Sequence, residues 1–495
     1  MKMKYYSTRS QKITANAPEA ILKGIAPDGG LYTPMDFSEM QIDLKSVLQM
    51  SAVEISAETV GRLLPDFAPE EMRALIEAAY AGKFETEDLT PVAKVGDAFV
   101  LELFRGPTSA FKDVALSVLP RLIVASREKL GVKDEIVILT ATSGDTGKAA
   151  LEGFRDVPGT RIIVFYPDGG VSDVQKAQMV TQEGGNVRVC AIRGNFDDAQ
   201  TGVKNIFADD SANGWAAKSG ARLSSANSIN LGRLAPQVAY YFKAYADLVL
   251  TGEITLGDEV NFVVPTGNFG NILAGEFARR MGLPVARLVC ASNANNVLTD
   301  FIRTGRYDRR REFFKTNSPS MDILVSSNLE RYLLLASEGD FDLVAKLMRE
   351  LGQNGVYDVP QSVLEAMQRR FSAYCATDAE AAETIGRVWR EHGYLLDTHT
   401  AVAWTAMEKF RAECDNGCAT VVLSTASPYK FSKDVLRALN GSAPEDGFEA
   451  MDQLHRLTKV PVPANLTGLR GRAARFDDCI DRDQMNHYVQ KAVAE

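Results

Sequence analysis

The stretch EIVILTATSGDTGKAA, residues 135–150, joins an apolar run to a glycine-rich loop and then to the start of a helix. Residues 135–140 are mostly Ile, Val and Leu, which is typical of a buried strand. The loop that follows, TSGDTG at 142–147, carries hydroxyls and glycines. A strand, a short loop and a helix in this order are the repeating unit of a parallel α/β sheet.

The same unit recurs on both sides of this stretch, which predicts a parallel sheet covered by helices. A chain of 495 residues is also too long for one core. Further strands are expected at 98–103, 161–165, 186–192, 259–265, 284–291 and 417–424. We expect an N-terminal, mostly helical domain at 1–95, an α/β core of two subdomains at 96–299 and 379–440, a helical insertion at 300–378, and a tail at 441–495 that packs on the core.

Composition excludes several classes of function. The net charge of -9 argues against nucleic acid as a partner, because phosphate backbones attract basic surfaces. No apolar run is long enough to cross a bilayer, and the N-terminus lacks the apolar core of a signal peptide. The six cysteines and four histidines follow no metal-ligand spacing, so we expect no metal site. Free thiols indicate a cytoplasmic protein.

A single lysine stands out in GPTSAFKDVALSVLPRL, residues 106–122. Lys112 lies where a loop of small and hydroxyl residues meets an apolar helix. A desolvated lysine has a lowered pKa, and its free amine can form a Schiff base with a carbonyl. The alternative interpretation is a solvated lysine at a helix start, which is what most lysines are.

Three loops follow predicted strands, where parallel sheets bind their ligands. They are TSGDTG at 142–147, TGNFGN at 266–271 and the segment 424–428. Glycines before a helix N-terminus suit an anion, although a packing turn or simple capping by Asp145 or Thr146 would use the same residues. The loop TGNFGN matches neither the Walker pattern nor GxGxxG. Two anion loops and a candidate Schiff-base lysine together suggest pyridoxal phosphate.

Five segments in this order resemble the signature blocks of threonine synthase, a fold type II pyridoxal-phosphate enzyme related to tryptophan synthase β. The resemblance runs from YYSTR at 5–9 and DGGLYTP at 28–34 to KVPVP at 459–463, and so covers nearly the whole chain. It implies a three-layer parallel-sheet α/β fold. The five segments are PTSAFKD (107–113), ATSGDTGKAA (141–150), NSINLGR (227–233), PTGNFGN (265–271) and STASPYKF (424–431).

The resemblance also implies roles for individual residues. Lys112 would form the Schiff base with pyridoxal 5'-phosphate and then move protons, and Thr425 would face the pyridine nitrogen. The cofactor phosphate would be held by Gly267, Asn268, Phe269, Gly270 and Asn271. The carboxylate and phosphate of the substrate, O-phosphohomoserine, would be bound by Thr108, Ser143, Thr146, Lys148 and Arg233. Arg233 could instead form a surface ion pair, and Lys148 could be a solvated helix residue.

The activity implied is that of a carbon–oxygen lyase acting on phosphates, which makes L-threonine and phosphate in the last step of threonine biosynthesis. Two alternatives remain: a lyase that releases 2-oxobutyrate from the same substrate, and a non-catalytic cofactor-binding protein. Two departures matter. Asp145 stands where relatives often have Asn, so its role stays open, and Ser427–Pro428 replaces a His-Pro found in some family members. The chain is expected to be a monomer or a homodimer.

Overall fold

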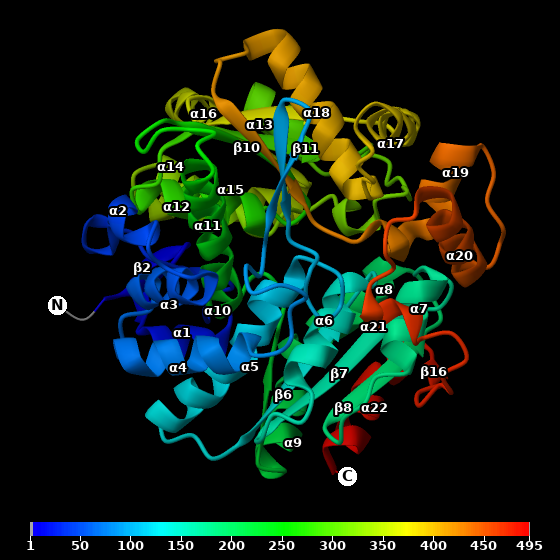
Figure 1. Cartoon of the computed structure of the whole chain (residues 1–495). Helices are drawn as coiled ribbons and strands as arrows, with labels where there is room; N and C mark the ends of the chain where they lie inside the picture. Colours follow the sequence, from blue (N-terminus) through cyan, green and yellow to red (C-terminus); the bar gives the residue numbers. More distant parts are fainter. Residues whose placement is uncertain (1–2, 495) are drawn as a thin grey trace.

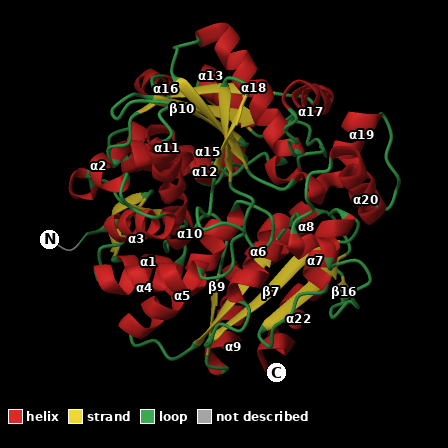
Figure 2. Ribbon diagram, viewed as in Figure 1, coloured by secondary structure: helices red, strands yellow, loops and turns green. Residues whose placement is uncertain are grey.

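Two separate β-sheets, each covered by helices, organise the computed structural model, which describes residues 3–494 (Figure 2). The first sheet has six strands in the order β14-β11-β10-β15-β5-β4. Its neighbouring strands are parallel except for β4, which pairs antiparallel with β5. The strands are β4 (Val92–Val95), β5 (Ala98–Glu102), β10 (Val260–Pro265), β11 (Val285–Ser292), β14 (Phe371–Cys375) and β15 (Ala419–Ser424).

The second sheet has five strands, all parallel, in the order β16-β8-β7-β6-β9. Its central strand β7 (Thr160–Pro167) is almost wholly buried, as expected for a strand covered on both faces. The other strands are β6 (Glu135–Ala141), β8 (Val187–Ile192), β9 (Ala221–Ser224) and β16 (Cys479–Ile480). All seven strands expected from the sequence form, and the fold class is confirmed as parallel-sheet α/β.

Helix α5 (Lys112–Lys129) connects the two halves of the molecule. It follows β5 of the first sheet but packs against α6 (Asp145–Phe154), which follows β6 of the second sheet (Figure 1). Pro120 inside α5 has no N–H to donate to Leu116 O, and Gly153 of α6 approaches that carbonyl so closely that a Cβ there would lie 1.9 Å from it. This close packing of α5 on α6 fixes the position of the first residues of α5 between the two sheets.

Other helices cover the faces of the sheets. The first sheet is covered by α18 (Thr398–Cys414), α12 (Gly270–Arg280) and α13 (Val297–Thr304), and the second by α8 (Phe196–Ala208) and α9 (Asp210–Lys218). The remaining helices of the core are α7 (Asp173–Val180), α10 (Leu231–Leu234), α11 (Ala239–Leu250), α17 (Asp378–His392) and α19 (Ser432–Asn440).

The N-terminal part contains more strand than its helical pattern predicts. Three short antiparallel strands, β1 (Tyr5–Ser7), β2 (Ser10–Ala15) and β3 (Tyr32–Thr33), form a sheet of their own. The helices are α1 (Ala17–Lys23), α2 (Leu44–Val47), α3 (Ala52–Leu63) and α4 (Pro69–Tyr80). The hydroxyl of Tyr80 donates to Val114 O of α5 at 3.0 Å, which ties this part to the connecting helix.

The segment 300–378, expected to be a helical insertion, contains strands as well as helices. It does contain α14 (Leu329–Ala336), α15 (Phe341–Asn354) and α16 (Gln361–Gln368). It also contains β12 (Arg306–Asp308) and β13 (Val356–Asp358), which pair with each other, and β14, which joins the first sheet beside β11. Strands of three to five residues are too short to show a period, and they form here because of pairing that is remote in sequence.

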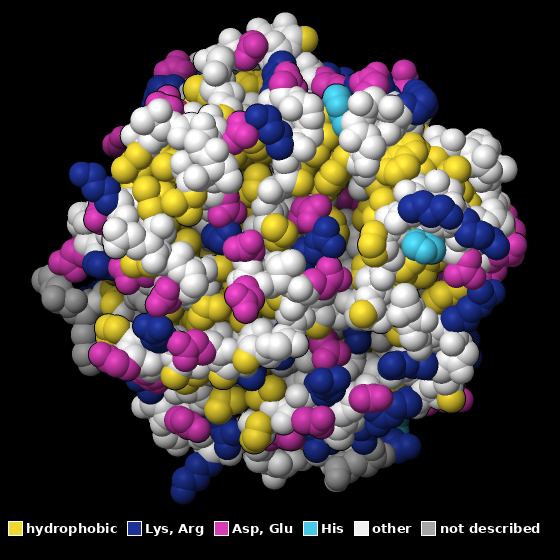
Figure 3. Space-filling model, viewed as in Figure 1, with side chains coloured by type: hydrophobic (Ala, Val, Ile, Leu, Met, Phe, Trp, Pro, Cys, Tyr) yellow, Lys and Arg dark blue, Asp and Glu magenta, His cyan; other side chains and the backbone are white. Residues whose placement is uncertain are grey.

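The C-terminal residues return to the second sheet. They form α20 (Gly447–Thr458), α21 (Ala464–Thr467) and α22 (Met485–Ala494), and β16 pairs with β8 at the sheet edge. On the face shown in Figure 3, acidic and basic side chains are interspersed over all of these parts. No helix within residues 3–494 combines the length and the apolar character needed to span a membrane.

Candidate active site

Three neighbouring strands of the first sheet end at the same edge, because β10, β15 and β5 are adjacent and parallel. The loop 266–269 follows β10, Thr425 follows β15, and the loop before Lys112 follows β5. The last two are joined directly. Phe111 N donates to Thr425 O at 2.9 Å, and Ser427 N donates to Ser109 O at 3.1 Å. The fold therefore brings the sequence-predicted cofactor residues to one edge.

Lys112 is buried at the first position of α5, with 7% of its surface exposed. Its Nζ donates to Ser320 Oγ at 3.3 Å and lies 3.5 Å from Asp145 Oδ2. Burial lowers the pKa of Lys112 to about 8, against the attraction of Asp145 and with help from the charges of Arg233 and Lys430. The interpretation as a solvated surface lysine is therefore wrong, and the amine is close to its reactive, uncharged form at neutral pH.

Asp145, whose role the sequence left open, faces Lys112 from the start of α6. Its Oδ1 lies 2.6 Å from Lys430 Nζ and accepts a hydrogen bond from Gln175 Nε2 at 2.9 Å. Burial by itself would raise the pKa of Asp145, but Lys430 and Lys112 outweigh it and hold that pKa well below its usual range. Asp145 is thus a buried carboxylate between two lysines.

The loop 267–271 has the properties of an anion site. Its carbonyls are used elsewhere: Gly267 O accepts from Ser326 Oγ at 2.8 Å, and Asn268 O accepts from Asn328 N at 3.0 Å. Among the described residues, the backbone N–H groups of 267–269 find no acceptor. Phe269, in the left-handed region at φ 61°, caps α12, whose first N–H groups are also free.

One buried donor beside this loop lacks a partner. Asn271 Oδ1 accepts from Tyr240 Oη at 2.6 Å and from Tyr241 Oη at 3.0 Å. Its Nδ2 is buried and has no acceptor among the residues of the structure. A buried unpaired donor costs about 1–3 kcal/mol, which a bound phosphate oxygen would offset. Thr425 is also buried, and its hydroxyl is free of hydrogen bonds to the described residues, so the site fits pyridoxal phosphate.

Sequence reasoning missed three residues that support Lys112. Lys430 lies inside the STASPYKF segment, and a buried carboxylate such as Asp145 needs a nearby cation. The sequence therefore did contain a signal for Lys430. Ser320 and His399 gave no signal. His399 Nε2 accepts from Ser320 N at 3.2 Å, and its Nδ1 lies 3.0 Å from Asp397 Oδ1. This contact holds the loop that carries Ser320 against Lys112.

Arg233 is buried and not part of a surface ion pair. Its exposed fraction is 6%, and its Nη1 donates to Ala226 O at 2.7 Å. No carboxylate among residues 3–494 pairs with it, and burial lowers the pKa of Arg233 to about 10. A buried cation without a countercharge is costly unless an anion binds there. Its charge contributes to the lowered pKa of Lys112, which indicates that the two side chains are near each other.

The other predicted substrate ligands differ in availability. Ser143 and Thr146 are partly exposed at the start of α6 and make no side-chain hydrogen bonds within the described part of the chain. The Thr108 hydroxyl instead donates to Asp113 Oδ1 at 2.5 Å. Lys148 is buried, not solvated, and its Nζ reaches Gln182 Oε1 at 2.5 Å and Glu152 at 3.3 Å. The roles of Ser143, Thr146, Thr108 and Lys148 as substrate ligands stay predictions.

Comparisons with known proteins point the same way. Residues 87–426 match the family described as pyridoxal-phosphate dependent enzyme, residues 4–80 match threonine synthase N terminus, and residues 400–489 match the C-terminal part of threonine synthase.

Individual relatives cover most of the chain. Threonine synthase of Pseudomonas aeruginosa is 37% identical over 95% of this chain and 100% of its own length. The human protein threonine synthase-like 1 is 39% identical over 87% of this chain, which spans 59% of that longer protein. A crystal structure of threonine synthase with bound pyridoxal phosphate, from Brucella melitensis, superimposes with a TM-score of 0.86 at 36% identity over 100% of both chains.

Proposed function

This chain belongs to the threonine synthase family of pyridoxal-phosphate-dependent enzymes, and from that premise we propose that it converts O-phospho-L-homoserine and water into L-threonine and phosphate. One observation carries the proposal. A buried lysine of lowered pKa, Lys112, shares a site with a loop of free N–H groups and with Arg233, a buried cation without a countercharge. Such a site suits a phosphorylated cofactor and an anionic substrate.

Pyridoxal phosphate, when bound, supplies an electron sink that stabilises negative charge on the substrate carbons. Lys112 Nζ would hold its aldehyde carbon. The N–H groups of 267–271 and the free Nδ2 of Asn271 would hold its phosphate. The Thr425 hydroxyl would face the pyridine nitrogen, where a neutral group leaves that nitrogen without an acidic partner.

Lys112 is the group best suited to move protons in this reaction. The free amine of Lys112 would take a proton from the substrate Cα, and a pKa near 8 leaves about a tenth of it unprotonated at pH 7, far more than an ordinary lysine. Ser320 Oγ, 3.3 Å from Nζ, fixes the direction of the amine. Asp145 stays ionised beside it and stabilises the lysine once it has gained the proton.

Substrate anions would occupy the positively charged side of the site. We assign the substrate phosphate to Arg233, because its guanidinium has unused donors and no carboxylate partner in the described chain. We assign the substrate carboxylate to Ser143 and Thr146, whose hydroxyls lie at the N-terminal end of α6. Thr108 and Lys148 would then support the site through Asp113 and Gln182.

The test is a product assay with purified protein, pyridoxal phosphate and O-phosphohomoserine, with Lys112→Ala beside it. We expect threonine and phosphate in equal amounts, both lost in the variant. Phosphate with 2-oxobutyrate would instead make the protein a lyase that fails to deliver water. No turnover with the cofactor bound would leave only the binding function. We further propose that the enzyme works in the cytoplasm as a monomer or a homodimer, without nucleic acid.

A further inference from the structure

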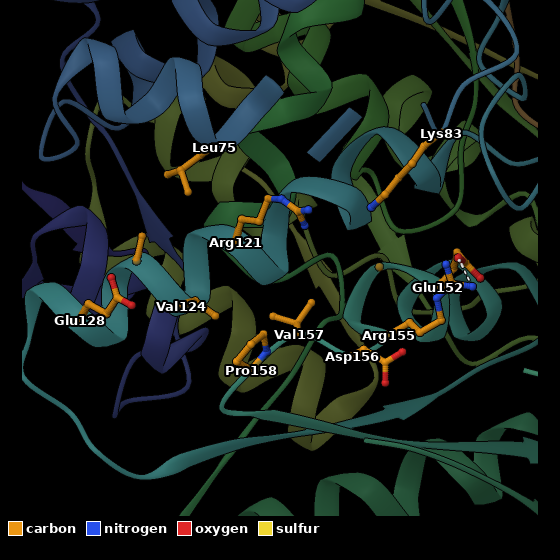
Figure 4. A pocket seen from close by; sticks show the side chains of 12 residues that line it. Leu75, Lys83, Arg121, Val124, Glu128, Glu152, Arg155, Asp156, Val157 and Pro158 are labelled. Atoms are coloured by element: carbon orange, nitrogen blue, oxygen red, sulfur yellow. Dashed lines mark ion pairs between the residues drawn. The ribbon is translucent and has the colours of Figure 1, made fainter. Parts of the chain in front are cut away.

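A cavity of about 420 Å³ lies on the outer side of α5 and α6, apart from the site around Lys112 (Figure 4). Arg121 and Val124 of α5, Glu152 of α6 and Leu75 of α4 are among its lining residues. Arg121 follows Lys112 by nine residues on the same helix, which corresponds to roughly 14 Å along the axis. The cavity is therefore a separate feature of the helices that begin at Lys112 and Asp145.

Two cations face each other at one end of this cavity. Figure 4 shows the ammonium of Lys83 and the guanidinium of Arg121 directed toward one another. Within residues 3–494, no carboxylate lies at ion-pair distance from either group. Burial lowers the pKa of Lys83, and the charge of Arg121 lowers it further, so the two cations are close enough to repel. Burial also lowers the pKa of Arg121.

The carboxylates that line the cavity do not neutralise this end. Glu152 lies 3.3 Å from Lys148 Nζ and 3.2 Å from Arg155 Nη1, and it accepts a third bond from Gln182. Asp156 Oδ1 accepts from Gly185 N at 2.8 Å. Glu128 is exposed to solvent. Glu152 and Asp113 attract Lys83 from a distance, but burial and the charges of Arg121 and Arg155 outweigh them and keep the pKa of Lys83 lowered. The end formed by Lys83 and Arg121 therefore keeps a net positive charge.

We propose that this cavity binds the phosphoryl group of a small metabolite between Lys83 and Arg121. A dianion placed between two like charges turns their repulsion into two favourable pairs, and the planar guanidinium can engage two phosphate oxygens at once. The volume of about 420 Å³ is in the range of small-molecule sites, so it admits more than the phosphoryl group itself. Leu75 and Val157 offer an apolar wall for the rest of the ligand.

The site is tested with orthophosphate as the probe and the enzyme saturated with cofactor. Equilibrium dialysis counts bound phosphate per chain. We expect two phosphates on the wild type, one at each site. Replacing both Lys83→Gln and Arg121→Gln should weaken one of them by roughly tenfold or more and leave turnover unchanged. Arg233→Gln should remove the other one.

Two comparisons make the assignment specific. Lys133→Gln removes the same charge from an exposed position on the turn after α5, and it should change neither phosphate. Arg121→Lys keeps the charge but loses the planar guanidinium that can donate to two phosphate oxygens. This variant should therefore bind phosphate more weakly than the wild type and more tightly than Arg121→Gln. One bound phosphate that only Arg233→Gln removes, or two that survive in the double variant, would overturn the proposal.

Discussion

Asp145 Oδ1 and Lys430 Nζ lie 2.6 Å apart with both side chains fully enclosed, and this pair is what allows a carboxylate to stand beside Lys112. Lys430 also donates to Thr108 O at 3.0 Å, so its position is fixed by the loop before Lys112. Because Lys430 neutralises Asp145, the carboxylate beside Lys112 raises the pKa of that lysine less than an unpaired carboxylate would.

Removing Lys430 should therefore destabilise the protein strongly. Lys430→Met leaves Asp145 buried beside Lys112 alone, and breaking a buried pair in this way costs about 3–5 kcal/mol. Denaturant unfolding of the apoprotein measures this loss. Adding Asp145→Asn should recover most of it, because no uncompensated charge then remains. Lys433→Met, three residues along the chain and paired with the exposed Glu445, is the control, and an equal loss of stability there would contradict this role of Lys430.

The low pKa of Lys112 should make the stability of the apoprotein depend on pH. The folded state releases the proton near pH 8, whereas the unfolded state keeps it up to the ordinary value of 10.5. The unfolded state thus binds more protons between these values, and stability rises with pH across this window. Well below pH 8, where Lys112 is charged in the folded state too, burying that charge lowers the free energy of unfolding by about 3 kcal/mol.

Lys112→Met removes this titration. The variant should be more stable than the wild type at pH 7, and the difference should shrink as pH rises from 8 toward 10.5. Unfolding curves at pH 7, 8 and 9 measure it. Lys129→Met, at the exposed end of the same helix, should follow the wild type at every pH. A gap that is constant with pH would show that Lys112 is not the titrating group.

Most of the fold, and the grouping of the candidate cofactor residues at one sheet edge, were predictable because their signals are local. A buried strand followed by a glycine loop and a helix is visible in sixteen residues, and Lys112 is marked by its own loop. Ser320, His399 and Lys430 were missed because each acts on a residue far away in sequence. Ser320 is 208 residues from Lys112, and only the folded chain brings them together. β14 was missed for the same reason.

His399 should matter through Ser320. His399→Ala removes the acceptor of the partly buried Ser320 N–H, and the loss of this hydrogen bond costs about 0.5–1.5 kcal/mol of stability. The loop would also hold Ser320 Oγ less firmly against Lys112, so kcat should fall while the cofactor still binds. His487→Ala, at an exposed position of α22, should change neither quantity. A stable His399→Ala with wild-type kcat would remove His399 from this role.

The loop 267–271, proposed to hold the cofactor phosphate, offers a steric test with a matched pair of glycines. A Cβ on Gly267 would lie 2.8 Å from Ser320 O, whereas one on Gly270 would meet nothing nearer than 3.4 Å. Gly267→Ala must therefore push the loop away from Ser320, and we expect pyridoxal phosphate to bind roughly tenfold more weakly or worse. Gly270→Ala should stay within a few-fold of the wild type. Titration of the apoprotein, followed by cofactor absorbance, distinguishes the two.

Arg233 should show opposite effects on stability and on substrate binding. Its buried charge has no carboxylate partner within the described chain, so Arg233→Gln should leave the substrate-free protein equally stable or more stable. The same change removes charged hydrogen bonds to the substrate phosphate, each contributing about 1.5–3 kcal/mol, and KM should rise at least tenfold. Arg331 is the matched control.

Arg331 is equally buried, but its guanidinium donates to Tyr32 O at 2.9 Å, to Asn328 Oδ1 at 2.5 Å and to Ile229 O at 2.6 Å. Arg331→Gln should lose stability because these acceptors are left unpaired, which is the reverse of Arg233→Gln. Unfolding curves of both variants without substrate measure the contrast. If Arg233→Gln loses as much stability as Arg331→Gln, Arg233 is a structural residue and the substrate phosphate binds elsewhere.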